Sequence, residues 1–128
     1  LEVAAGQRLT GRVADHGADW VLIELDTGAE ALVSLGCVMA IHGLVARSRE
    51  ATTARRFGWG SVLRALARDR SAVEVVDRAG TRRVGTIDVV LSDAFELAEH
   101  ALDVPRRQEN VASRVVVPFA AVAMVRRR

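Results

Sequence analysis

Residues 73–90, VEVVDRAGTRRVGTIDVV, decide the fold of this chain. Valine, isoleucine and threonine favour strands, whereas the residues between the two valine-rich runs, at positions 78–80, are typical of a turn. The stretch therefore predicts two neighbouring strands, over residues 72–77 and 81–89. Strands with this alternation keep one face apolar, so we expect them to cover a core.

The chain on either side of this stretch continues the pattern. Downstream we expect a turn near residues 91–93 and strands over residues 94–99, 114–117 and 122–126. Pro118 is expected to end the middle strand of these three, because proline has no N–H to donate to a neighbouring strand. Upstream, residues 61–68 (SVLRALAR) predict a helix capped by Ser61, with Leu63 and Leu66 on its apolar face.

An internal repeat relates the beginning of the chain to this second part. Residues 1–24 align without a gap on residues 75–98, and residues 33–41 align on residues 117–125. The matches include Gly11 with Gly85 and Asp19 with Asp93. The repeat predicts strands in the first copy over residues 10–15, 20–25 and 30–33, and a short turn at residues 35–38 before a last strand. Ten extra residues in the second copy are expected in a loop, between the strand ending at Glu99 and the next one.

A short helix followed by five bent strands resembles the Sm-like (LSm/Hfq-like) superfamily. The residues that carry the resemblance are 62–66 (VLRAL), 73–90 and 115–125 (VVVPFAAVAMV). The resemblance implies an all-β chain of two tandem Sm-like (SH3-like) five-stranded barrels, with one short helix before the second. A glycine at the place of Gly85 lets the second strand of such barrels bend sharply, and Gly11 would do the same in the first copy. Small SH3-like and PRC-type barrels share much of this spacing.

The expected domains follow from the two copies. Residues 1–44 form a first barrel whose opening strand is cut by the start of the chain, residues 45–60 form an Arg-rich linker, and residues 61–128 form a second barrel. The resemblance also implies assembly through strand edges, as a dimer or as a trimer that would look like a six-membered ring. A monomer whose edges pair internally is the other expectation.

The resemblance implies RNA binding, but the loops of this chain depart from the superfamily's pattern. Sm-like rings hold a base with a loop residue after the second strand, usually an asparagine preceded by aspartate. The corresponding loops here read HGADW at residues 16–20 and LSDAF at residues 91–95, without an asparagine. Asp19 and Asp93 recur in these loops, and we expect them to cap turns rather than to share a ligand.

Arginine and aromatic residues gather in the linker and in the long loop, and they are the candidate RNA-binding residues. They are Arg47, Arg49, Arg55, Arg56, Phe57, Trp59, Arg106 and Arg107. Guanidinium groups contact phosphates and aromatic rings stack on bases, which together hold single strands without sequence preference. In the alternative interpretation the linker is a solvated connector, and Phe57 and Trp59 pack against a barrel.

Composition narrows the functional classes. Half of the 128 residues are hydrophobic, which is sufficient for a core, and all 18 basic residues are arginine against 16 acidic ones. Arginine in place of lysine indicates codon bias, so its abundance is weak support for nucleic-acid contact. The longest uncharged run, residues 31–46, is too short to span a bilayer, and the single Cys37 excludes a disulfide framework within one chain.

These features predict a non-catalytic binding module without a metal or cofactor. The three histidines lack the paired spacing of a zinc helix, and the chain has no glycine-rich phosphate loop. The expected ligand is RNA or an RNA-associated protein, in the cytoplasm and without membrane contact. The alternative is a protein-interaction scaffold that does not contact nucleic acid. A third and more distant class is an enzyme or small-ligand sensor that acts through the Asp and His loops.

Overall fold

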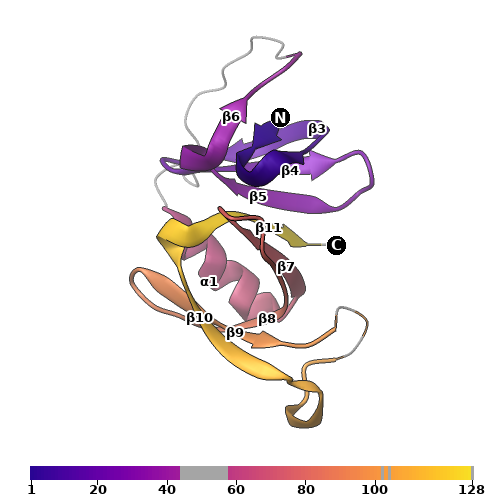
Figure 1. Ribbon diagram of the computed structural model, residues 1–128, viewed down its shortest axis with the longest axis vertical. Coiled ribbons are helices and arrows are strands. Elements are labelled where there is room, and N and C mark those ends of the chain that lie inside the picture. The colour runs from indigo at the N-terminus through magenta and orange to yellow at the C-terminus, as the bar shows by residue number, and fades with distance from the viewer. Residues whose placement is uncertain (44–57, 102, 104, 128) are drawn as a thin grey trace.

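The computed structural model describes residues 1–43, 58–101, 103 and 105–127, and it is built mainly of strands (Figure 1). The first half of the chain contains β1 (Glu2–Val3), β2 (Gln7–Arg8), β3 (Gly11–His16), β4 (Trp20–Leu25), β5 (Glu30–Ser34) and β6 (Val38–Ala40). The second half contains α1 (Trp59–Asp69), β7 (Ala72–Asp77), β8 (Arg82–Val90), β9 (Ala94–Glu99), β10 (Ser113–Pro118) and β11 (Val122–Arg127). The expected all-β class with one short helix is confirmed.

The strands form two sheets. One has three strands in the order β2-β1-β6, and the other has eight strands in the order β10-β9-β8-β7-β11-β5-β4-β3. Two separate closed barrels were expected, but the pairing within the described residues closes neither sheet into a ring. The reason is β11, which pairs along one edge with β7 of its own half and along the other with β5 of the first half. The two halves therefore share one continuous sheet.

The internal repeat is visible in the pairing registers. A one-residue irregularity falls between Val13 and Asp15 where β3 meets β4, and the equivalent one falls between Ile87 and Val89 where β8 meets β9. A 3-10 turn follows β5 at Leu35–Cys37, and another follows β10 at Phe119–Ala121. The two halves are thus built by the same sequence of local structures.

At one equivalent position in each copy, the backbone of the neighbouring strand leaves no room for a side chain. A Cβ on Gly11 would overlap the backbone carbonyl oxygen of Glu24 on the next strand, and a Cβ on Gly85 would overlap that of Ala98. The neighbouring strand therefore passes closer than any side chain allows.

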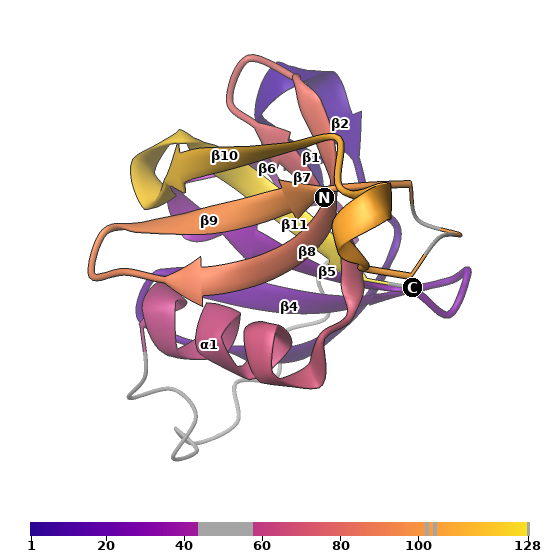
Figure 2. The same ribbon diagram turned by 90° about the horizontal axis from the view of Figure 1, so that it is seen from below.

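Two hydrophobic clusters interlock at the junction of the halves. The cluster under α1 combines Leu63, Phe95 and other residues of the second half with Trp20 and Leu32 of the first. The other cluster lies in the first half and includes Val76, Ala123 and Met124 from the second. Each half thus completes the core of the other, and α1 lies against β8 (Figure 2).

The helix begins two residues earlier than the sequence predicts. Gly58 is the residue before its first turn, and Ser61, the expected cap, lies inside the helix. The first backbone N–H, that of Trp59, instead donates to Oδ1 of Asp19 at 3.1 Å. A carboxylate from the first half therefore caps the helix of the second half.

Candidate functional site

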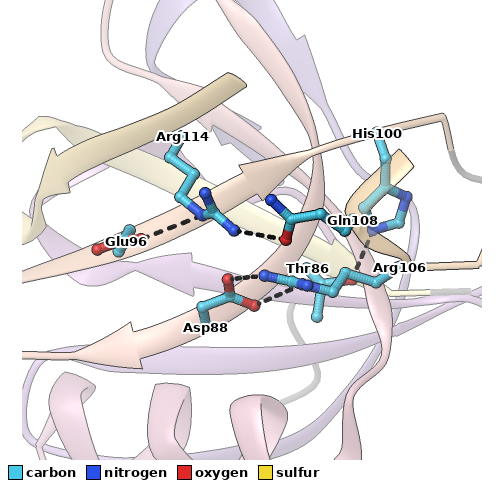
Figure 3. Close-up of polar contacts among 7 residues, drawn as sticks. All are labelled: Thr86, Asp88, Glu96, His100, Arg106, Gln108 and Arg114. Atoms are coloured by element: carbon cyan, nitrogen blue, oxygen red, sulfur yellow. Dashed lines mark hydrogen bonds and ion pairs between the residues drawn. The ribbon is translucent and has the colours of Figure 1, made fainter. Parts of the chain in front are cut away.

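A polar cluster covers the outer side of β8, β9 and β10, where the second copy carries its ten extra residues (Figure 3). Arg106, in that loop, donates from Nε and Nη2 to the two carboxylate oxygens of Asp88 on β8, at 3.1 and 2.6 Å. Such a two-point contact fixes the guanidinium in one plane. Hydrogen bonding to Asp88 raises the pKa of Arg106 above its ordinary value, and burial opposes the shift.

A second arginine of the cluster lies on β10. Arg114 is 3.8 Å from the Glu96 carboxylate on β9 and donates to the side-chain oxygen of Gln108 at 3.3 Å. Gln108 lies in the extra loop, so this contact ties the loop to the sheet at a second point (Figure 3).

A buried histidine completes the cluster. His100 is 6% exposed at the end of β9, and its Nε2 lies 2.6 Å from the hydroxyl oxygen of Thr86 on β8. Its Nδ1 lies 2.8 Å from the carbonyl oxygen of Ala101, which only accepts, so Nδ1 carries a proton. Both ring nitrogens are therefore used within the protein, and the histidine has no nitrogen free for a substrate.

The candidate RNA-binding residues are placed as follows. Arg47, Arg49, Arg55, Arg56 and Phe57 lie outside the described residues. Trp59 is 5% exposed and belongs to the hydrophobic cluster under α1, so its ring is covered by protein. Arg106 is held by Asp88, whereas Arg107 is exposed and forms no ion pair within the described part of the chain.

The sequence reasoning missed a row of arginines on the outer side of α1. Arg64 and Arg68 are exposed and four residues apart, so they lie on one face of the helix, and Arg70 follows at its end. None of the three forms an ion pair with a described residue. The i, i+4 spacing in SVLRALARDR could have revealed this row, because the apolar residues of the same segment occupy the opposite face.

Among the outer strands of the two sheets, β6 and β10 carry the most exposed apolar side chains. Met39 on β6 is 72% exposed, and Ile41 just after it is 55% exposed. Val116 on β10 is 57% exposed. β6 pairs only with β1, and β10 pairs only with β9, in the described part of the molecule. Each edge thus combines unpaired backbone groups with apolar side chains, which favours pairing with another strand.

No family model, curated protein or solved structure matches this chain. The function is therefore argued from its own geometry.

Among the residues that the structure describes, no group of three or more His, Cys, Asp or Glu side chains is arranged to hold a metal ion. The helix in this part of the chain, α1, is too short and too charged to cross a bilayer. What the geometry offers instead is two outer strands with highly exposed apolar side chains, β6 and β10, and a row of exposed arginines.

Proposed function

We propose that the chain is a non-catalytic interaction module made of two Sm-like units, and that it assembles with further copies of itself by pairing its edge strands. One observation carries this proposal: β11 of the second half pairs antiparallel with β5 of the first half. β11 is the last strand of the second copy of the repeat, and β5 is the strand before the last in the first copy. Repeating the same junction between chains requires β6 and β10, the two edges described above.

The repeat also predicts the register of that pairing. Within the chain, Val125 on β11 faces Leu32 on β5. The alignment of residues 33–41 on 117–125 makes Ile41 the residue equivalent to Val125. Val116 is equivalent to Leu32, because Leu32 faces Leu22 on β4, Val116 faces Glu96 on β9, and Leu22 aligns with Glu96 in the repeat. Ile41 of one chain would thus face Val116 of the next. Such a head-to-tail contact forms a ring where its rotation closes, for example a trimer with six units.

The pairing is tested by thiol cross-linking of two variants, Ile41→Cys and Val116→Cys, mixed in equal amounts. The native Cys37 is 1% exposed and so does not compete for a thiol reagent. We expect a short bifunctional thiol reagent to join the two variants into a covalent dimer, and sedimentation of the wild-type chain to show a mass of two or more copies. Val89→Cys mixed with Ile41→Cys is the control, because Val89 is 46% exposed but belongs to β8, which is not an outer strand, and pairs with Glu96 of β9. The proposal is contradicted if the wild-type chain sediments as a monomer and the mixture of Ile41→Cys and Val116→Cys gives no cross-linked dimer.

RNA binding is a second candidate function, favoured by the unpaired arginine row on α1. Arg64, Arg68 and Arg70 carry exposed guanidinium groups that no described carboxylate neutralises, and phosphates are their natural partners. In the sequence, α1 directly follows the linker that carries Arg55 and Arg56. A single strand contacting both segments would be held through its backbone without base readout.

Fluorescence anisotropy with labelled mixed-sequence RNA over a salt series tests this second function. Two double variants, Arg64→Gln with Arg68→Gln and Arg55→Gln with Arg56→Gln, should weaken binding and reduce the salt slope by about two, since each phosphate contact contributes nearly one unit. The control removes the same charge from two arginines that already have carboxylate partners, Arg8→Gln with Arg12→Gln. Undetectable binding at low salt excludes this function. Equal effects of all three double variants exclude α1 and the linker as the specific RNA-binding site.

A further inference from the structure

An open apolar hollow lies on the first half of the chain, between β3, the turn after β5, and β6. Its volume is about 880 Å³. Its apolar lining includes Leu9, Val13, Val21, Leu35, Val38 and Ile41, and charged or polar side chains, namely Glu2, Arg8, Arg12, His16 and His42, line it as well. Three of these side chains are unusually accessible: Val13 is 47% exposed, Leu35 42% and Ile41 55%. Exposed side chains of this kind grouped in one hollow mark a binding surface more often than scattered ones do.

The second half shows what covers the same place. The internal repeat maps Val13 to Ile87 and Ile41 to Val125, which are 2% and 1% exposed. Both belong to the hydrophobic cluster that Trp59 and Leu63 of α1 complete. The helix lies against β8, the counterpart of β3 (Figure 2). The two halves thus present the same surface, covered by an amphipathic helix in one and open in the other.

The counterpart of Leu35 supports the same mapping. Leu35 opens the 3-10 turn after β5, and Phe119 opens the equivalent turn after β10. Phe119 packs against the cluster under α1, and a Cβ on Gly60 of that helix would lie 3.4 Å from its ring. The hollow therefore carries apolar side chains at positions equivalent to those that α1 covers in the second half.

We propose that this hollow is the docking site for an amphipathic α-helix of a partner protein, with a bulky aromatic side chain followed four residues later by leucine. That is the spacing of Trp59 and Leu63, the two α1 residues buried in the equivalent place. Helices of this kind bind grooves through their i and i+4 side chains. A second copy of the chain is a poorer occupant, because its own α1 already buries both side chains.

A synthetic peptide of residues 58–70, labelled with fluorescein, serves as the probe for this site. We expect saturable binding to the full chain with one peptide per chain, measured by anisotropy. Val13→Glu in the chain should weaken binding at least tenfold, because it introduces a charge into the hollow. Val89→Glu is the matched control: Val89 is 46% exposed on β8, and it does not line the hollow. A peptide in which both Trp59 and Leu63 are replaced by alanine should not bind.

Three outcomes overturn the proposal. The first is no saturable binding of the peptide. The second is equal binding by the Val13→Glu and Val89→Glu chains, which means that the peptide enters elsewhere, for example by displacing α1 itself. The third is self-association of the wild-type chain that the Val13→Glu substitution abolishes, together with no binding of the peptide. This result would assign the hollow to a second copy of the chain. Cross-linking between Ile41 and Val116 tests the strand edges with separate variants, so the two proposals can fail independently.

Discussion

The carboxylate of Asp19, in the turn between β3 and β4, accepts a hydrogen bond from the backbone N–H of Trp59 at 3.1 Å. Forty positions separate the two residues, and the bond satisfies one of the N–H groups that a helix leaves free at its start. The first half thus fixes where α1 begins. The junction of the halves is therefore held by a helix cap as well as by strand pairing and a shared core.

Replacing Asp19 by alanine should lower the free energy of unfolding by about 1 kcal/mol, the usual loss when a helix cap is removed. Urea unfolding followed by tryptophan fluorescence measures this loss, and both tryptophans of the chain, Trp20 and Trp59, lie in the core cluster under α1. Asp93→Ala is the control, because Asp93 occupies the equivalent turn in the second half and its side chain has no hydrogen bond to a described residue. Equal losses in the two variants would show that the cap contributes nothing specific.

Much of the local structure could be predicted from the sequence, because strand alternation and turn residues act within a few positions. Trp20–Leu25, Ala72–Asp77 and Ala94–Glu99 are strands over the predicted residues. The start of α1 was predicted two residues late because its cap comes from Asp19, which no local pattern connects to it. Pairing of strand edges within the chain was one of the two expectations, but the sequence could not show that β11 pairs with β5, since this partner lies far away in sequence.

The candidate site was less predictable than the fold. Arg106 was expected to contact RNA, but a reading of the sequence cannot show that Asp88, eighteen positions earlier, lies within hydrogen-bonding distance of it. Trp59 was an aromatic residue next to arginines, and its burial depends on the packing of α1 against the sheet. The repeat itself, visible in the sequence, was the most informative feature, because it relates the open edges and the hollow to their occupied counterparts.

Replacing Gly85 by alanine should destabilise the chain by about 1–3 kcal/mol or more, because the added methyl group overlaps the carbonyl of Ala98 and one strand must move. Gly11→Ala should cost less, since β3 is the outer strand of its sheet and can shift. Gly36→Ala is the control, because its Cβ would have no neighbour closer than 3.6 Å. Chemical denaturation of the three variants ranks their free energies of unfolding. A Gly85→Ala chain as stable as the Gly36→Ala chain would contradict the close approach of the Ala98 carbonyl to Gly85.

Replacing Asp88 by asparagine should release the loop between β9 and β10. The change removes the charged partner of Arg106 and replaces one of its two carboxylate oxygens by an amide that cannot accept. Limited trypsin digestion followed by mass spectrometry should then show faster cleavage after Arg106 and Arg107. Glu24→Gln breaks the exposed pair with Arg12 and should leave this cleavage unchanged. An unchanged cleavage rate in Asp88→Asn would mean that the loop is held by other contacts.

The pair of Glu2 and His42 should make stability depend on pH in the acidic range. The His42 ring nitrogen lies 2.8 Å from one Glu2 carboxylate oxygen, and Arg8 donates to the other at 3.1 Å. Hydrogen bonding first to His42 and then to Arg8 lowers the pKa of Glu2 in the folded chain. A carboxylate with a lowered pKa stabilises the fold above its ordinary pKa of about 4.3, and this contribution is lost as pH falls through the lowered value.

The measurement is the stability difference between the wild-type chain and Glu2→Gln at several pH values. We expect the full difference above the ordinary glutamate pKa of about 4.3, a decreasing one as the pH falls through the lowered pKa of Glu2, and none once Glu2 is protonated in both states. His42→Gln is the control: a carbon-detected NMR titration should show the Glu2 pKa rising towards its ordinary value in that variant, because the largest cause of the shift is gone. A Glu2 pKa that stays the same in His42→Gln would assign the shift to Arg8 alone.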